Sequence, residues 1–172
     1  MNTGTFLVIG IMVGVMIAAW FLSRKTWKKE CEYDEMQLKI RARGYQIGFY
    51  TALGLMLALI LLWEVNGLTV VTPGFAIYTA MIISVTVFVI YCILNDAFLA
   101  IRGKADRYFM LFGFFVLLEG FIFVRSLMDG EILENGKLTF GSGAPAVMAI
   151  CFLAILITLA VKTFRNRKEA QE

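Results

Sequence analysis

The chain contains no histidine among its 172 residues. This absence excludes acid–base catalysis by imidazole, haem ligation by histidine and the commonest zinc sites, because each of these needs a ring nitrogen. The three cysteines, Cys31, Cys92 and Cys151, form no CxxC pair, and two of them lie inside apolar runs. The sequence therefore predicts no metal ion, no cofactor and no disulfide framework, and an enzymatic role is not expected.

Charge is also scarce. Charged residues make up 17% of the chain and hydrophobic residues 60%, and the mean hydropathy is +0.78. An ordinary soluble domain is about 45–50% apolar, so this excess needs a bilayer as its solvent. Acidic residues such as Glu30 and Glu32 interrupt the main basic cluster, and nucleic-acid binding is therefore not expected.

Five apolar runs stand between the charged stretches. They cover residues 6–22, 46–63, 76–94, 108–127 and 144–164. Each is long enough to cross a hydrocarbon core of roughly 30 Å as a helix rising 1.5 Å per residue. Continuous runs of this length favour helices over the alternating strands of a barrel. We therefore expect an all-α integral membrane protein in which residues 1–172 form one membrane domain of five transmembrane helices.

The distribution of lysine and arginine predicts the orientation. Fourteen of the sixteen basic residues lie in segments 23–45 and 95–107 or from Lys162 onward, and only Arg125 and Lys137 lie elsewhere. Basic residues favour the cytoplasmic side. We therefore expect the N-terminus outside and the C-terminus in the cytoplasm. Segments 23–45, 95–107 and 165–172 would be cytoplasmic, and segments 1–5, 64–75 and 128–143 external.

Local signals refine two of these segments. Asp34 followed by Gln37 is typical of a helix N-cap with its reciprocal partner, which predicts one long helix from Glu35 through Trp63; the alternation of apolar and polar residues over 36–42 leaves a strand as the competing interpretation. In the external segment 131–140, Asn135-Gly136 is a preferred pair for a type I′ turn. This pair predicts a short external β-hairpin.

One ionisable residue lies deep in an apolar run. Glu119 is about eleven residues from Tyr108, roughly 16 Å from the inner boundary at 1.5 Å per residue. A charge at that depth is costly. Ser84 and Thr86 should lie at the same depth and are the expected hydrogen-bond partners. Two roles remain open: Glu119 binds a proton or cation in a polar cavity, or it is protonated and locks two helices together.

Two further sets of residues attract attention. Asn95 and Asp96 form a second polar spot at the inner end of the third run; if that helix continued to Ile101, Asp96 would pair with Arg102 or Arg107. Small residues at helical spacing predict close helix contacts. They are Gly10, Gly14, Gly44, Gly48, Gly113 and Gly120.

The segment Asp34-Glu35-Met36-Gln37, followed by basic residues and a span, resembles a recurring feature of small multi-pass membrane proteins of Gram-positive bacteria. The resemblance covers residues 30–60 and implies a bacterial plasma membrane. With no nucleotide loop, nucleophile–base pair or inverted repeat, the sequence favours a protein that acts through its partners: an accessory, sensor-like or immunity-like subunit, as a homo-oligomer or with another membrane protein. The alternative is a small transporter or a proton- or ion-conducting oligomer that uses Glu119.

Overall fold

The computed structural model describes residues 33–66, 70–99, 105–130 and 136–169. They form four helices: α2 (Glu35–Asn66), α3 (Pro73–Leu94), α4 (Ala105–Met128) and α5 (Phe140–Glu169). All four are long and apolar enough to cross a membrane. The all-helical prediction is therefore confirmed over these residues, with four candidate spans. The run 6–22, which carries Gly10 and Gly14, lies outside them.

Polar residues at the start of α2 explain where this helix begins. The backbone N–H of Asp34 donates to Gln37 Oε1 at 3.3 Å, and the N–H of Glu35 donates to Asp34 Oδ1 at 2.7 Å. These bonds satisfy donors that have no partner within the first helical turn. The helix then runs unbroken to Asn66, so the competing strand interpretation is wrong.

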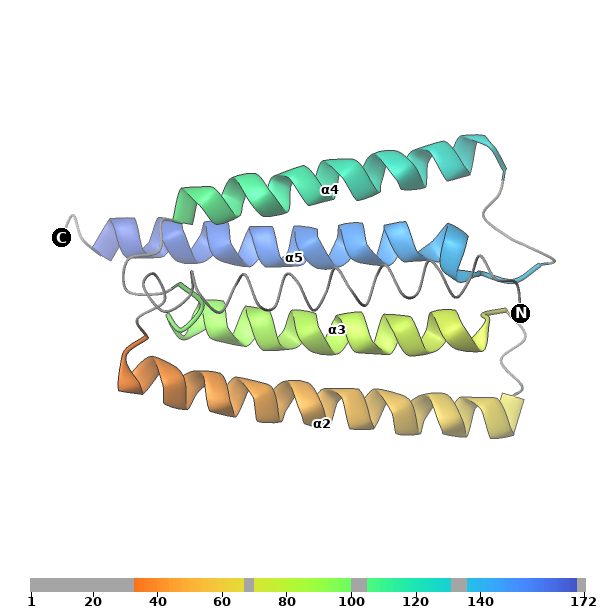
Figure 1. The fold of residues 1–172 in the computed structure, drawn as a ribbon, viewed down its shortest axis with the longest axis horizontal. Coiled ribbons are helices and arrows are strands. Elements are labelled where there is room, and N and C mark those ends of the chain that lie inside the picture. The colour runs from red at the N-terminus through yellow and green to blue at the C-terminus, as the bar shows by residue number, and fades with distance from the viewer. Residues whose placement is uncertain (1–32, 67–69, 100–104, 131–135, 170–172) are drawn as a thin grey trace, which may run out of the picture.

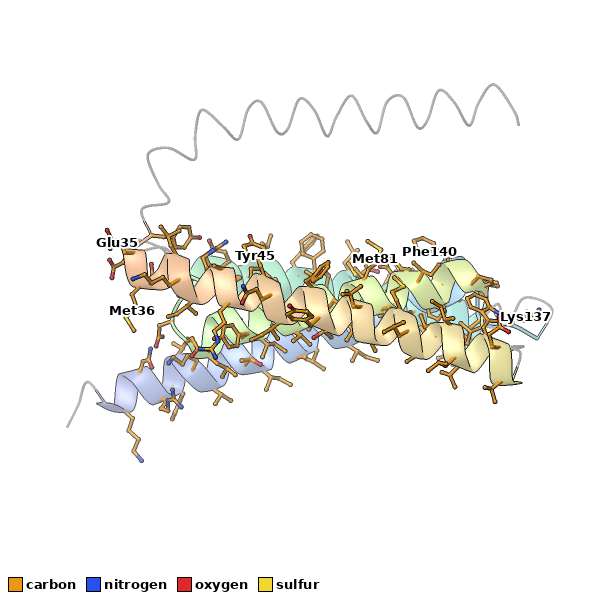
Figure 2. All side chains as sticks on the ribbon, turned by 90° about the horizontal axis from the view of Figure 1, so that it is seen from below. Glu35, Met36, Tyr45, Met81, Lys137 and Phe140 are labelled. Carbon is orange, nitrogen blue, oxygen red and sulfur yellow. The ribbon has the colours of Figure 1, made fainter. Side chains whose placement is uncertain are left out.

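The four helices lie side by side in the order α2, α3, α5, α4 (Figure 1). Among the described helices, α2 contacts only α3, α4 contacts only α5, and α5 lies between α3 and α4. We call the end where α2 begins and α5 ends the basic end. Its described basic residues are Lys39, Arg41, Arg43, Lys162, Arg165 and Lys168. Glu35 and Met36 mark this end in Figure 2, and Lys137 and Phe140 mark the opposite end.

The core lies on both sides of α5, where it packs against α3 and against α4, in the half of the bundle near the basic end. Ile93, Ile155 and Leu159 are almost fully buried there. Aromatic rings extend this core across the α4–α5 contact: Phe152 lies 6.0 Å from Phe112 and 5.3 Å from Phe115, measured between ring centroids. By contrast, many large apolar side chains on the outer surfaces are exposed, as expected where lipid replaces water around a span.

The opposite end does not support the predicted hairpin. Leu138 forms a parallel bridge with Val71: its N–H donates to the Val70 carbonyl, and its own carbonyl accepts from the Thr72 N–H. Since α5 already begins at Phe140, little chain remains for a second hairpin arm, and segment 131–135, the other arm, lies outside the described residues. Gly136 does adopt a positive φ of 75°, which suits a turn.

Candidate functional site

The C-terminus of α3 ends in a tight turn built on Asp96. The N–H of Ala97 donates to the Cys92 carbonyl at 2.8 Å, and the N–H of Asp96 donates to the Ile93 carbonyl at 3.3 Å. These two bonds are those of a Schellman motif, in which the residue after the cap adopts a left-handed conformation. Asp96 has a φ of 56°. Glycine usually occupies this position, and aspartate is one of the few other residues that tolerates it.

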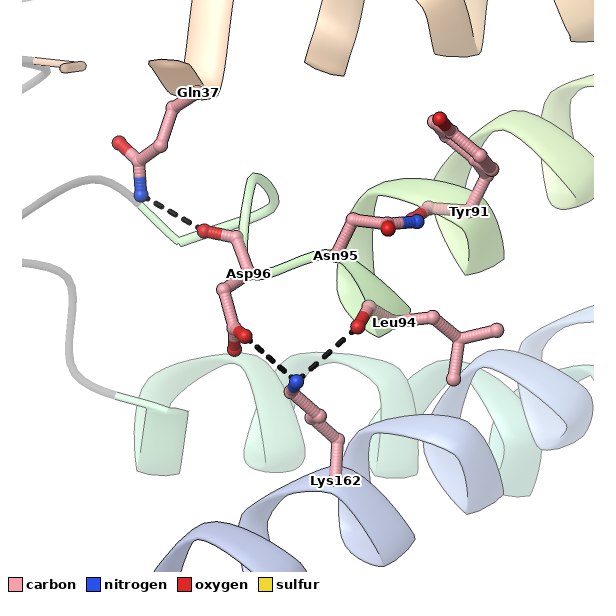
Figure 3. Close-up of polar contacts among 6 residues, drawn as sticks. All are labelled: Gln37, Tyr91, Leu94, Asn95, Asp96 and Lys162. Atoms are coloured by element: carbon pink, nitrogen blue, oxygen red, sulfur yellow. Dashed lines mark hydrogen bonds and ion pairs between the residues drawn. The ribbon is translucent and has the colours of Figure 1, made fainter.

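The side chain of Asp96 is held by a lysine from α5. Lys162 Nζ lies 2.6 Å from Asp96 Oδ2 and also donates to the Leu94 carbonyl at 3.1 Å (Figure 3). The Lys162 side chain is 10% exposed and that of Asp96 is 64% exposed. The lysine therefore places its ammonium against both a carboxylate and the negative end of the α3 dipole.

Two side chains from α2 hold the same turn from the other side. Gln37 Nε2 donates to the carbonyls of Asp96 (2.8 Å) and Leu99 (3.2 Å), and Arg41 Nη1 donates to the Ala97 carbonyl at 3.4 Å. We call residues 95–99 the α3 turn. Because Gln37 also caps its own helix, one amide group couples the start of α2 to the end of α3.

The structure corrects the expected surroundings of the second polar spot. The helix ends at Leu94 and does not continue to Ile101, and the Asp96 carboxylate pairs with Lys162, which in the sequence counted only among the basic residues that predict the orientation. The Asn95 amide donates to the Tyr91 carbonyl at 2.8 Å. These contacts stabilise the joint between α2, α3 and α5.

Glu119 lies on the side of α4 that faces α5. It follows Phe112 by seven residues, two helical turns, and so continues the face on which Phe112 contacts Phe152. The helices separate along this face: a Cβ on Gly113 would lie 3.7 Å from Leu156, but one on Gly120 would meet no atom within 4 Å. Glu119 is therefore only half-buried.

The expected partners of Glu119 lie elsewhere. Ser84 Oγ donates to the Ala80 carbonyl at 2.7 Å and Thr86 Oγ1 to the Ile82 carbonyl at 2.8 Å, both within α3. Since α5 separates α3 from α4, the structure does not bring these hydroxyls to Glu119. Within the described part of the chain, Glu119 makes no hydrogen bond and no ion pair.

One polar side chain that the sequence did not connect with Glu119 is electrostatically coupled to it. Tyr78 of α3 interacts electrostatically with both Glu119 and Cys151 of α5. Tyr78 lies nearer the end of its helix than Ser84 does, so its depth in the sequence does not indicate this interaction. No three histidine, cysteine or acidic side chains gather as a metal site among the described residues.

The glycines of α2 bring it close to α3. A Cβ on Gly44 would lie 3.1 Å from atoms of Phe88 and Tyr91, and one on Gly48 would lie 3.2 Å from Phe88. Both glycines are buried. Gly143 of α5, which the sequence did not single out, lies even closer to a neighbouring helix. A Cβ at this position would press into the ring of Phe75 on α3.

Among the described residues, two apolar grooves lie between α2 and α3. One, of about 340 Å³, lies in the half near the basic end, between Gly48 on α2 and Phe88 on α3. The other, of about 290 Å³, lies in the opposite half, between Leu59 and Phe75. Glu119 lines neither groove.

Comparisons of the chain with protein families, with curated proteins and with solved structures find no match.

Proposed function

We propose that this chain is a multi-pass subunit of the bacterial plasma membrane, its basic end in the cytoplasm, that acts by binding other transmembrane helices. The single observation that carries the proposal is Glu119. This carboxyl group is half-buried on a spanning helix, and it has no hydrogen bond or ion pair within the described part of the chain. A polar group in hydrocarbon needs a partner, and a helix packed beside the separating ends of α4 and α5 would supply one.

The shape of the bundle supports the same proposal. As an edge helix, α4 contacts only α5 among the described helices. The face that points away from α5 carries Leu117 and Phe121, which are 75% and 70% exposed, and it is purely apolar there. Glu119 points away from this lipid-like face and toward the opening beside α5. A partner that reaches it must therefore pack at the α4–α5 boundary.

The alternative, a small transporter or ion-conducting oligomer, rests on the same carboxylate. Conduction needs further polar groups along a path. The two grooves described are apolar, and Glu119 lines neither of them. We therefore favour the interaction role, and the experiment below includes a result that would support the transport alternative.

Self-association in liposomes tests this proposal in its simplest case, a second copy of the chain. Donor- and acceptor-labelled copies are mixed, and energy transfer is followed as lipid dilutes the protein. A hydrogen bond between membrane helices contributes about 0.6–2 kcal/mol, so Glu119→Leu should weaken association roughly 3- to 30-fold. Glu119→Gln, which keeps donor and acceptor atoms, should associate like the wild type.

Glu64→Gln is the matched control, because Glu64 is exposed near the opposite end of α2 and should not affect association. A pH-sensitive dye inside the same liposomes measures proton flux. Flux well above that of empty vesicles, abolished by Glu119→Gln with association unchanged, would replace the interaction proposal with the transport alternative.

A further inference from the structure

The groove near the basic end is lined almost entirely by carbon. On α2 its wall is formed around Gly48 and Ala52, one turn apart, and on α3 around Met81 and Phe88. Since neither Gly48 nor Ala52 has a long side chain, the wall is recessed there. Ser84, the one hydroxyl on the α3 side, already donates to the Ala80 carbonyl. The groove therefore offers an apolar channel with no free donor along the α3 wall.

Tyr45 closes the groove toward the basic end. Its ring stacks on Phe88 with centroids 4.4 Å apart. Tyr45 and Met81 point to the same broad face of the bundle (Figure 2). The groove is thus open along its length to whatever surrounds that face, and its aromatic end lies where the bundle becomes charged.

A cation lies directly beyond this aromatic end. Arg41 precedes Tyr45 by one helical turn and interacts with its hydroxyl. The ring of Tyr33 covers the guanidinium at 4.3 Å, and Arg41 Nη1 donates to the Ala97 carbonyl. Arg41 forms no ion pair with a described carboxylate; Asp96, the acid at the α3 turn, is paired with Lys162.

We propose that this groove binds one acyl chain of an anionic phospholipid, whose phosphate is held by Arg41 and Tyr45. Arginine has five N–H donors in a planar fork that suits phosphate, and the contacts above leave donors for it. The volume of about 340 Å³ lies at the small end of the range for ligand pockets, roughly 300–1,000 Å³. This inference rests on a membrane location and is independent of Glu119.

Selectivity must come from the headgroup. An acyl chain gains little by leaving other lipid tails for an apolar groove, because both surroundings are equally apolar. A basic residue at the membrane surface contributes about 1 kcal/mol toward an anionic lipid, which corresponds to roughly a fivefold preference. The groove should therefore retain phosphatidylglycerol about five times better than phosphatidylcholine.

Native mass spectrometry of the full chain, released from nanodiscs of equal phosphatidylglycerol and phosphatidylcholine content, measures this ratio. Arg41→Gln should reduce the ratio to near one. Arg43→Gln is the matched control, because Arg43 is exposed two residues further on, about 200° around the helix, and should leave the ratio unchanged. Ala52→Phe, which fills the groove, should lower the retention of both lipids.

Photoactivatable phosphatidylglycerol with a reactive group in its tail should label peptides that contain Met81 or Phe49. Equal retention of the two lipids by the wild type, or an equal effect of the Arg43 control, would overturn the proposal. Two cross-linking results would also overturn it. One is a disulfide between a cysteine introduced at Met81 and a second cysteine introduced within residues 6–22. The other is a disulfide between two chains that each carry Met81→Cys. These results would assign the groove to the chain itself or to a second copy.

Discussion

Replacing Lys162 by methionine should lower the free energy of unfolding by about 2 kcal/mol. Exposed ion pairs contribute about 0.2–1 kcal/mol, and breaking a fully buried pair costs about 3–5 kcal/mol. The pair with Asp96 lies between these cases, because Lys162 is 10% exposed and Asp96 is 64% exposed. Methionine keeps most of the apolar stem in place but leaves the Leu94 carbonyl without its lysine donor.

The partner substitution Asp96→Asn should cost less, about 1 kcal/mol. Asparagine tolerates the left-handed backbone and keeps an oxygen that Lys162 can reach, so only the charge is lost. If the two side chains stabilise the protein through each other, the double variant loses less than the sum of the single variants. We expect a coupling energy of about 1 kcal/mol.

Unfolding is measured by titrating sodium dodecyl sulfate into mild-detergent micelles and following helical circular dichroism. Lys168→Met is the matched control, since Lys168 is exposed on the same helix, and it should change stability by less than about 0.5 kcal/mol. Losses that add to within about 0.3 kcal/mol, or an equal loss in the control, would refute the assignment of the joint to this ion pair.

Four glycine substitutions, in two matched pairs, test the packing in the same assay. Gly143→Ala should destabilise the protein by about 1–3 kcal/mol, the usual cost of overpacking, because its Cβ would press into the Phe75 ring. Gly141→Ala is the control and should not destabilise the protein, because its Cβ would meet only the Thr139 hydroxyl at 4.0 Å. Equal losses in the two variants would argue against the contact between Gly143 and Phe75. Gly44→Ala should destabilise, since its Cβ would press on Phe88. Gly54→Ala should stabilise by about 0.5–1 kcal/mol, because it adds helix propensity in open space; a loss at both sites would contradict the placement of α2.

Features set by local chemistry were predictable from the sequence. The start of α2 was predictable because it depends on a cap between Asp34 and Gln37, two residues only three positions apart. The end of α3 at Leu94 was also predictable, because it coincides with the end of the apolar run 76–94. Helix class and approximate length follow from apolar runs that are long enough to span a bilayer.

Contacts between distant segments were not predictable in this way. Ser84 was the expected partner of Glu119 because the two residues lie at the same depth along their runs, but depth does not say which helices are neighbours. The structure inserts α5 between α3 and α4, and this order depends on packing along whole helices. Lys162 likewise entered the prediction of orientation by its charge alone, although the same charge can pair with an acid 66 positions earlier, Asp96.

The order of the helices across the bundle also has a consequence for biosynthesis. Neighbours α2 and α3 are consecutive in the chain, so they can pair as soon as both have entered the bilayer. The next helix, α4, contacts neither of them. Among the described helices its docking surface is supplied by α5, which follows α4 in the chain. During translation α4 therefore has no packing partner among the described helices until α5 has been made and has inserted between α3 and α4.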